Sequence, residues 1–278
     1  MRPTFGSDGP SATVVVAAYN QPHELALVLA ALSAQTDPNF DVVIADDGSD
    51  PPAERELGAL AAELPFAIEW TWQEDAGFRK MRAQNRAALR RNSELILFLD
   101  GDCVPYRNWV ATYRRHARPG EFLVGGYIFL TQEETLGLTP DAVRAGAHER
   151  PLDPATWWRL HSAHWRNRLY AGRRKNRPRI RGGNFAVARD LFERVDGFDE
   201  AFAGYGKEDS ELRNRMRSAG ARGISLWTRA RLCHVSSRVF PGVPRPQTPR
   251  DLYEQSFSRV RARVGLSSHA SDPPGASP

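Results

Sequence analysis

The first hundred residues alternate between short, continuous apolar runs and longer stretches in which apolar side chains recur every three or four positions. The apolar runs predict four buried strands, at residues 13–18, 40–45, 68–72 and 95–99. The stretches between them predict three helices, at residues 25–32, 54–64 and 79–91. Strands that alternate with helices through short connections are typical of βαβ units, so we expect an α/β fold with a mostly parallel sheet. No Gly-x-Gly-x-x-Gly follows the first strand, which disfavours a dinucleotide-binding Rossmann domain.

The pattern changes after residue 102. It predicts helices at 109–116, at 190–195 and from 208 onward, and strands at 122–130, 224–226 and 230–235. Residues 131–180, rich in Arg, Trp and His, are expected to be irregular. The leader 1–11 and the small, polar, Pro-rich tail 267–278 are expected to be disordered.

The composition is ordinary for a soluble globular protein, with 41% hydrophobic and 26% charged residues among 278. No apolar stretch approaches the ~20 residues that span a bilayer, and the first residues lack the apolar segment of a signal peptide. Two cysteines, Cys103 and Cys233, do not make a disulfide framework, and small buried hydrophobes are their simplest interpretation. We therefore expect a cytoplasmic protein.

The net charge is +5, and much of the excess lies in one stretch. Residues 159–181 hold no acidic residue and nine basic ones: Arg159, Arg166, Arg168, Arg173, Arg174, Lys175, Arg177, Arg179 and Arg181. Such a stretch attracts phosphates, anionic lipid or nucleic acid, although a solvated basic loop is the simpler interpretation. Nearby ring-bearing residues have spacings that could form one helical face: Trp157, Trp158, His161, His164 and Trp165. Tryptophan beside arginine suits a membrane interface, so one interpretation is a peripheral contact with an anionic membrane through residues 159–181. Docking on a lipid-linked or anionic glycan acceptor is the other, and we expect no nucleic-acid partner. A non-catalytic membrane or nucleic-acid binding module is the alternative function.

Candidate chemistry begins with Asp100-Gly101-Asp102, directly after the apolar run 95–99. Two carboxylates on a tight turn suit a hard divalent cation, and ligands bind at the carboxyl ends of parallel strands. Asp46 and Asp47 follow the second strand at the same edge, where a carboxylate can accept hydrogen bonds from a base or a ribose. Plain acidic turns are the alternative for both pairs.

Several motifs in one order resemble the family 2 glycosyltransferases with the GT-A fold. They are Val-Val-Val-Ala-Ala-Tyr-Asn at 14–20, Asp-Asp-Gly-Ser at 46–49, Asp-Gly-Asp at 100–102, Gly-Gly-Asn-Phe at 182–185, Gly-Tyr-Gly-Lys-Glu-Asp at 204–209, and His234. The second half resembles the galactosyltransferase-type region of chondroitin-polymerase-like enzymes. The resemblance covers roughly residues 12–240 and implies one GT-A domain with helices around a mostly parallel sheet. It places the domain at 12–266, with a nucleotide-sugar-binding half at 12–104, an acceptor and catalytic half at 105–240, and a C-terminal extension at 241–266.

The resemblance also implies a metal and donor site. Asp102 would be the direct metal ligand, His234 would complete the site, and Asp100 would face the ribose or a metal-bound water. A histidine ligand favours Mn²⁺ over Mg²⁺, because imidazole is softer than carboxylate. Further donor contacts are implied at Ala17, Tyr19, Asn20, Asp46, Asp47, Arg79, Arg82, Asn85, Gly101, Gly182, Gly183 and Asn184. Gln84 stands where an Arg is expected, which leaves the phosphate contact open.

Glu208 and Asp209 form a second carboxylate pair, at the expected start of a helix. Acidic residues there favour the helix dipole, which is the structural interpretation. By resemblance, Asp209 is the catalytic base and Glu208 contacts the acceptor hydroxyl, while Lys207 replaces a Gly common in relatives. The implied activity is metal-dependent inverting transfer from a UDP-linked sugar to a glycan or lipid-linked saccharide. A nucleotidyltransferase is disfavoured, because residues 19–22 lack a Gly-rich basic loop.

Overall fold

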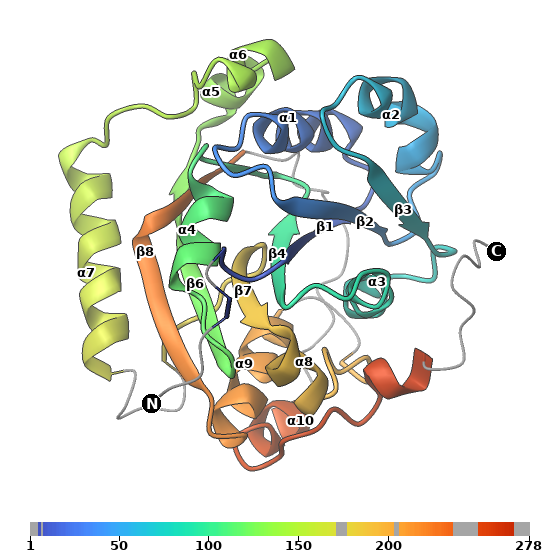
Figure 1. Cartoon of the computed structure of the whole chain (residues 1–278), viewed down its shortest axis with the longest axis vertical. Coiled ribbons are helices and arrows are strands. Elements are labelled where there is room, and N and C mark those ends of the chain that lie inside the picture. Colours follow the sequence, from blue (N-terminus) through green and yellow to red (C-terminus); the bar gives the residue numbers. More distant parts are fainter. Residues whose placement is uncertain (1–4, 7, 171–176, 203–205, 236–249, 270–278) are drawn as a thin grey trace.

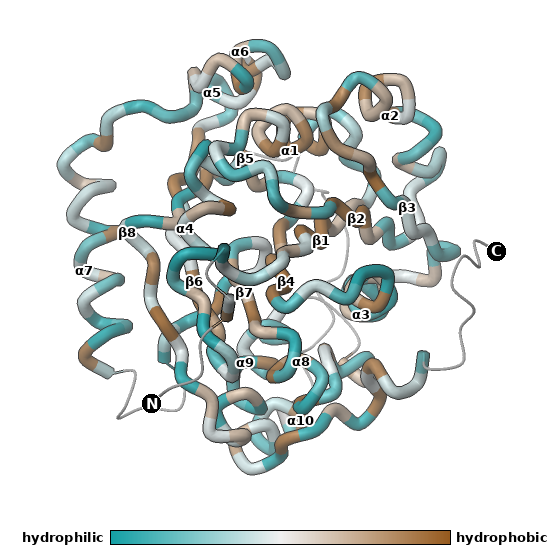
Figure 2. The backbone as a smooth tube through the Cα atoms, viewed as in Figure 1, coloured by the Kyte–Doolittle hydropathy of each residue, from teal (hydrophilic) through white to brown (hydrophobic). Residues whose placement is uncertain are grey.

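The computed structural model describes residues 5–6, 8–170, 177–202, 206–235 and 250–269. One eight-stranded mixed sheet runs through the centre, in the order β3-β2-β1-β4-β7-β6-β8-β5. Figure 1 shows it curled and enclosed by helices, with α1 and α2 above the first strands, α3 below them, and α7 along the left edge. Figure 2 shows that the hydrophobic residues gather on the central strands. The α/β fold with a mostly parallel sheet is therefore confirmed.

The first four strands form a parallel unit. They are β1 (Ala12–Ala18), β2 (Phe40–Asp46), β3 (Ile68–Trp72) and β4 (Leu95–Asp100). Between them lie α1 (Pro22–Ser33), α2 (Ala53–Ala62) and α3 (Lys80–Ala88). The runs in β1, β2 and β4 are buried because both faces of this part of the sheet are covered. β2 and β4 flank β1 on opposite sides, so the order reverses at β1, where open α/β sheets bind ligands.

The second half extends the same sheet. Its strands are β5 (Cys103–Pro105), β6 (Glu121–Phe129), β7 (Asn184–Ala188) and β8 (Arg222–His234). The helices α4 (Trp109–His116), α8 (Arg189–Arg194), α9 (Glu208–Ser218) and α10 (Arg250–Gln255) pack around them. β7 is antiparallel to both neighbours, β4 and β6, and so joins the two halves of the protein.

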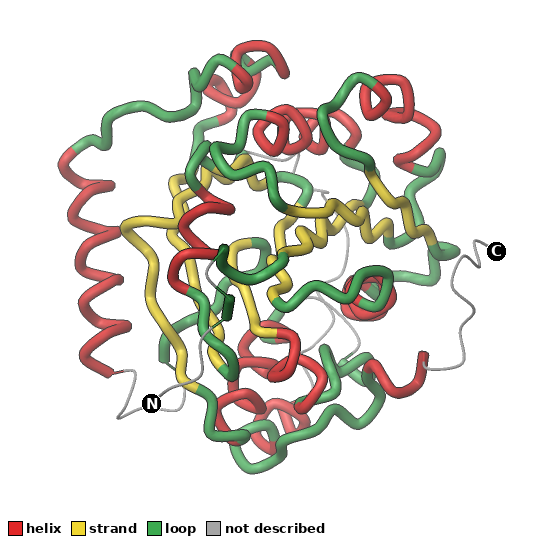
Figure 3. The backbone as a smooth tube through the Cα atoms, viewed as in Figure 1, coloured by secondary structure: helices red, strands yellow, loops and turns green. Residues whose placement is uncertain are grey.

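Two predictions about the second half were wrong. Residues 131–180 were expected to be irregular, yet the described part contains α5 (Gln132–Leu136), α6 (Pro140–Arg144) and the long α7 (Pro154–Tyr170), as Figure 3 shows. Only three residues of α7 are buried, which leaves little apolar periodicity to detect. The two short strands expected at 224–226 and 230–235 are one strand, β8, because an irregularity at Gly125 and Gly126 lets pairing with β6 continue.

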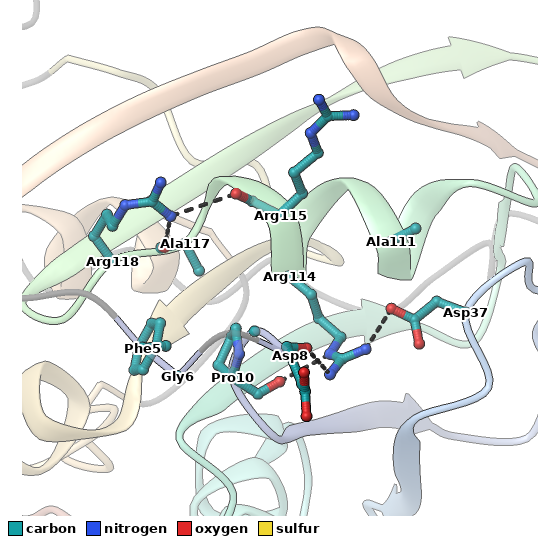
Figure 4. Close-up of a pocket in the computed structure, with 11 residues that line it drawn as sticks. Phe5, Gly6, Asp8, Pro10, Asp37, Ala111, Arg114, Arg115, Ala117 and Arg118 are labelled. Atoms are coloured by element: carbon teal, nitrogen blue, oxygen red, sulfur yellow. Dashed lines mark hydrogen bonds and ion pairs between the residues drawn. The ribbon is translucent and has the colours of Figure 1, made fainter.

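Parts of both terminal segments are packed rather than disordered. Phe5 lies against the hydrophobic core, and Arg114 of α4 donates hydrogen bonds to the carbonyls of Asp8 and Pro10. These residues border a cavity of about 400 Å³, drawn in Figure 4. At the other end, residues 266–269 form a 3₁₀ helix in which His269 Nε2 lies 2.6 Å from Glu200 Oε1.

Candidate active site

Three charged groups converge on the backbone of Gly182. A Cβ atom built on Gly182 would lie 3.0 Å from Asp209 Oδ2, 3.2 Å from Asp100 Oδ2 and 3.4 Å from Lys80 Nζ. Lys80 also donates a 2.5 Å hydrogen bond to Asp100 Oδ1. The side chains come from α9, β4 and α3, so the fold brings together residues more than a hundred positions apart.

Strand pairing fixes the glycines against Asp100. Asn184 of β7 pairs with Leu99 of β4, so Gly183 comes to lie beside Asp100. Gly183 has φ +64°, and a Cβ there would be 2.6 Å from Asp100 Cγ. Both the backbone angle and the space therefore require glycine at this position. On the other side, a Cβ on Gly101 would lie 2.7 Å from the Ala17 carbonyl oxygen of β1.

The titratable groups of the cluster shift one another's pKa. Burial and, next, the charge of Glu208 raise the pKa of Asp209 to about 8, against the opposing positive charge of Lys80. Glu208 is buried, and its Oε2 accepts a 2.8 Å hydrogen bond from the Gly206 amide. Burial by itself would lower the pKa of Lys80, but the charges of Asp100 and Asp209 raise it overall, so Lys80 stays positive.

Lys80 is a site residue that the sequence interpretation missed. It is the first residue of α3 and lies among several basic residues, so it reads as part of a solvated face. No local pattern distinguishes it from Arg79 or Arg82. The signal that could have found it is topological: α3 follows β3 and so begins at the carboxyl edge of the parallel strands, where Asp100 ends β4.

Asp102 and His234 form a second cluster next to the first. β5 pairs with the end of β8, so Cys103 lies opposite His234. His234 Nε2 is 3.6 Å from Asp102 Oδ2, and the side-chain ligand atoms of Asp102, Cys103 and His234 all lie within 4.8 Å of one another. His234 Nδ1 is 2.9 Å from the Val235 carbonyl, which requires a proton on Nδ1 and leaves Nε2 free to act as a ligand.

The donor set of this cluster is a carboxylate and an imidazole. Burial raises the pKa of Asp102, although the charge of His234 opposes this. Burial also raises the pKa of the Cys103 thiol well above its usual value, so the thiol stays protonated and is a poor metal ligand. One oxygen and one nitrogen ligand suit Mn²⁺, with positions left over for donor oxygens.

The two acids that follow β2 have different surroundings. Asp46 Oδ1 accepts from the Ser49 amide and hydroxyl, and Oδ2 accepts from the Ala53 amide, so this carboxylate holds the start of α2. Asp47 accepts from Gln73 Nε2 at 2.6 Å and from the Arg79 amide at 2.8 Å. Burial raises the pKa of Asp47 to about 6. Asp47 is therefore the member of the pair that joins β2 to the segment before α3.

The loop after β1 borders the same edge. Tyr19 is 39% exposed, and its hydroxyl donates to Asp75 Oδ2 at 2.9 Å. Asn20 has a φ of +48°. Its side-chain Oδ1 accepts a hydrogen bond from the Asp50 backbone amide, and its backbone amide donates one to Ser49 Oγ. An adjacent cavity of about 230 Å³ is lined in part by Asn20, Ser49 and Asp50. Tyr19 thus presents an accessible ring beside this loop.

Two of the expected donor contacts lie inside the fold. Asn85 is fully buried and bonded to the Phe198 backbone and to Glu200. Asn184 Oδ1 accepts from Trp109 and Tyr113, both at 2.8 Å, and its Nδ2 donates to the carbonyls of Gly126 and Ala230. The hydrogen-bonding groups of both amides are therefore used within the protein.

Arg79 and Arg82 lie at the start of α3 and are partly buried. The Arg79 guanidinium donates to the Glu74 carbonyl. Both side chains have a buried Nε without a hydrogen-bond partner in the described part of the chain. Of the expected donor contacts on this helix, these two arginines therefore retain hydrogen-bonding capacity.

Comparison with known proteins then identifies the family. The family model described as glycosyl transferase family 2 matches residues 13–195, which is well over half of the chain. The chain belongs to glycosyltransferase family 2. A second model, described as the N-terminal domain of galactosyltransferase, matches residues 166–237 of this family 2 protein.

Curated relatives resemble this chain in sequence, and solved structures resemble it in fold. Chondroitin synthase of Escherichia coli is 28% identical over 228 residues, which cover 75% of this chain and 32% of that protein. The chain spans 32 to 54% of the length of the first curated relatives it matches. A structure of the mannosyltransferase PcManGT from Pyrobaculum calidifontis, in complex with GDP-Man and Mn²⁺, aligns with a TM-score of 0.58 at 20% identity, covering 87% of this chain and 60% of that one. A structure of GalNAc-T7 with UDP, GalNAc and Mn²⁺ aligns with a TM-score of 0.63 at 15% identity, covering 91% and 48%. The similarity to these structures shows that this family 2 protein has the GT-A fold.

Proposed function

We propose that this protein is a metal-dependent, inverting glycosyltransferase that moves a sugar from a UDP-linked donor to a hydroxyl of a glycan or lipid-linked saccharide. The observation that carries the proposal is the convergence of Asp209, Asp100 and Lys80 at Gly182, beside the Asp102–His234 pair. Solved neighbours of the same fold contain nucleotide sugars or nucleotides together with Mn²⁺, which supports this choice of donor and metal.

Asp102 and His234 would hold the metal. Their donor atoms are close enough to share one ion, and the free Nε2 of His234 fits that role. A divalent cation bound there would act as a Lewis acid that neutralises charge on the departing diphosphate. Asp47 would contact the nucleoside, because it lies at the carboxyl end of β2 beside the accessible ring of Tyr19.

Asp209 is the proposed general base. Its Oδ2 would take the proton of the acceptor hydroxyl while that oxygen bonds to the anomeric carbon and the bond to the diphosphate breaks. The configuration then inverts and no covalent enzyme intermediate is needed. A pKa of about 8 puts Asp209 near the pH at which a general base is most effective. Glu208, at the preceding position, would orient the acceptor, and Lys80 would hold Asp100 in place.

Calorimetric titration of UDP, with Mn²⁺ and again with EDTA, tests the donor and metal site. We expect binding that requires Mn²⁺ and is lost in Asp102→Ala. Asp141→Ala is a matched control, because it removes an exposed acidic side chain of α6 and should leave binding unchanged. Metal-dependent binding of GDP but not UDP would change the donor and keep the reaction class. Absence of nucleotide binding would contradict the proposal.

Asp209→Asn tests the chemical step separately. We expect turnover to fall by roughly 10²–10⁴, the usual effect of losing a general base, while UDP affinity stays within about twofold. Full turnover in this variant would exclude Asp209 as the base, and a parallel loss of UDP affinity would instead make it a binding residue.

A further inference from the structure

The outer face of α7 carries exposed apolar side chains that the transfer reaction does not use. Trp158, Trp165 and Leu169 are 68%, 58% and 63% exposed. They are seven and four positions apart, so they lie on one side of the helix. The buried residues of α7 lie on the opposite side, where the helix packs against β8 and β6: Leu160, Ala163 and Asn167. Figure 1 shows α7 at the edge of the molecule, with its outer face away from the sheet.

This concentration of apolar surface is unusual for the protein. Of the ten large hydrophobic side chains that are exposed in the described part of the chain, five lie on α7, which has 17 residues. The other five are scattered over separate elements. Single exposed hydrophobic residues need no explanation, but a cluster on one helix indicates an interaction surface.

The charges around the outer face indicate what it binds. Arg166 and Arg168 of α7 are exposed, and the Arg168 guanidinium lies 5.9 Å from the centre of the Trp165 ring. No acidic residue occurs in the sequence between Asp153 and Asp190. The surface therefore combines apolar rings with positive charge. Tryptophan rings with arginines beside them suit the boundary between lipid headgroups and acyl chains.

We infer that the outer face of α7 docks the protein on an anionic lipid bilayer. A second copy of the chain fits less well, because a two-fold contact would bring Arg166 and Arg168 close to the same residues of the partner. Among the described residues, no helix is long and apolar enough to cross a membrane, so α7 would lie in the plane of the surface.

The docked helix is joined to the candidate active site by direct contacts. Arg159 of α7 donates to the Tyr127 carbonyl at 3.1 Å and lies 5.4 Å from the centre of the Phe129 ring. That ring is in turn 5.4 Å from the ring of His234. Docking would therefore hold the site close to the bilayer, where lipid-linked acceptors are found. This last point rests on the proposed function, but membrane binding itself does not.

Sedimentation with vesicles tests the inference in the full chain. We expect binding to vesicles of phosphatidylcholine with phosphatidylglycerol, little binding to phosphatidylcholine alone, and release by salt. Arg166→Gln/Arg168→Gln should weaken binding about 25-fold, at roughly fivefold for each arginine. Trp158→Ser/Trp165→Ser should weaken it at least tenfold and abolish the blue shift of tryptophan fluorescence. Both variants change exposed side chains, so the fold and UDP binding should be unaffected.

Matched controls separate this surface from general charge and hydrophobicity. Arg55→Gln/Arg115→Gln removes the same charge from exposed positions elsewhere, and Leu136→Ser removes a side chain that is 75% exposed on α5. Both should bind vesicles like the wild type. Equal loss in the controls, equal binding to neutral vesicles, or no vesicle binding at low salt would overturn the inference. So would a dimer in solution that Trp158→Ser/Trp165→Ser dissociates, or binding to nucleic acid that needs the arginines but not the tryptophans.

Discussion

Replacing Lys80 with Met should raise the pKa of Asp209, because it removes the positive charge that opposes the effects of burial and of Glu208. Lys80 Nζ and Asp209 Oδ2 lie 3.4 and 3.0 Å from the same point at Gly182, so they are at most about 6.4 Å apart. At an effective dielectric constant of about 20, the attraction is about 2.6 kcal/mol, or about 2 pKa units. We expect the pKa to rise from about 8 to about 10.

Asp209 must be ionised to act as a general base, so a higher pKa lowers the fraction of active enzyme. At pH 8 about half of the wild-type Asp209 would be ionised, and about 1% in Lys80→Met. Turnover at pH 8 should therefore fall about 50-fold and recover as the pH rises. In the wild type, turnover should increase with pH through about 8, because only the ionised carboxylate accepts a proton.

The direct assay is a ¹³C NMR titration of the ligand-free protein labelled at aspartate carboxyl carbons, with Asp209→Asn to assign the resonance. The pH profile of sugar transfer at saturating Mn²⁺ is the second readout. Lys80→Arg keeps the charge and should keep both midpoints. A Lys80→Met variant that loses activity equally at every pH, with an unchanged Asp209 titration, would refute the electrostatic reasoning and leave Lys80 a purely structural role.

Four further variants test other parts of the structure. Asn184→Ala removes four hydrogen bonds in the core and should lower the free energy of unfolding by about 4 kcal/mol in urea denaturation; loss of nucleotide affinity at full stability would contradict this. Gly183→Ala should reduce transfer at least tenfold, because its Cβ would meet Asp100, and wild-type kinetics would show that the loop can move aside. Asp46→Ala should cost about 1–2 kcal/mol of stability through the start of α2 and leave UDP affinity intact in calorimetry. Asp209→Asn should gain thermal stability relative to the wild type as the pH rises from 4 towards 8. The pKa of Asp209 is higher in the folded protein than in the unfolded chain, so the stability that protonated Asp209 contributes is present at low pH and is lost as the pH rises through about 8. A stability difference between Asp209→Asn and the wild type that does not change with pH would contradict this.

The sequence predicts the first half of the fold well because that half is built from local units. Each apolar run of β1, β2 and β4 is long enough to fill a strand that is buried on both faces, and each connection is short. These strand predictions also locate Asp47, Asp100 and Asp102 at the carboxyl edge of the sheet, since the carboxyl ends of parallel strands lie at one edge.

The second half depends on pairings that no local pattern contains. The position of β7 between β4 and β6 is set by contacts across the chain, and so is the meeting of Gly183 with Asp100. The ring spacing at 157–165 indicated a helical face within α7, but the helix as a whole was not predicted, because its exposed tryptophans mask the contrast between an apolar and a polar face. Family resemblance brought Asp209 and His234 into the candidate site, whereas position alone favoured a helix-dipole role for Asp209.

Residue type was the weakest guide to function. Asp46, Asn85 and Asn184 have the polar groups of ligand-binding residues, yet each uses them to satisfy buried backbone or side-chain groups of the protein. Lys80 looks like a surface residue and instead lies among carboxylates. The difference lies in what surrounds each side chain after folding, which depends on elements distant in the sequence.

The connection between β6 and β7 begins and ends at the candidate site. It leaves the sheet at Phe129, whose ring lies against His234, and returns at Gly183, against Asp100. Its two ends are fixed because β6 and β7 pair directly, and between them Leu138, Val143 and Leu160 are buried in the core. Any exchange of this segment among family members must therefore keep those apolar positions, whereas its exposed side chains can vary at the border of the candidate site without loss of the sheet.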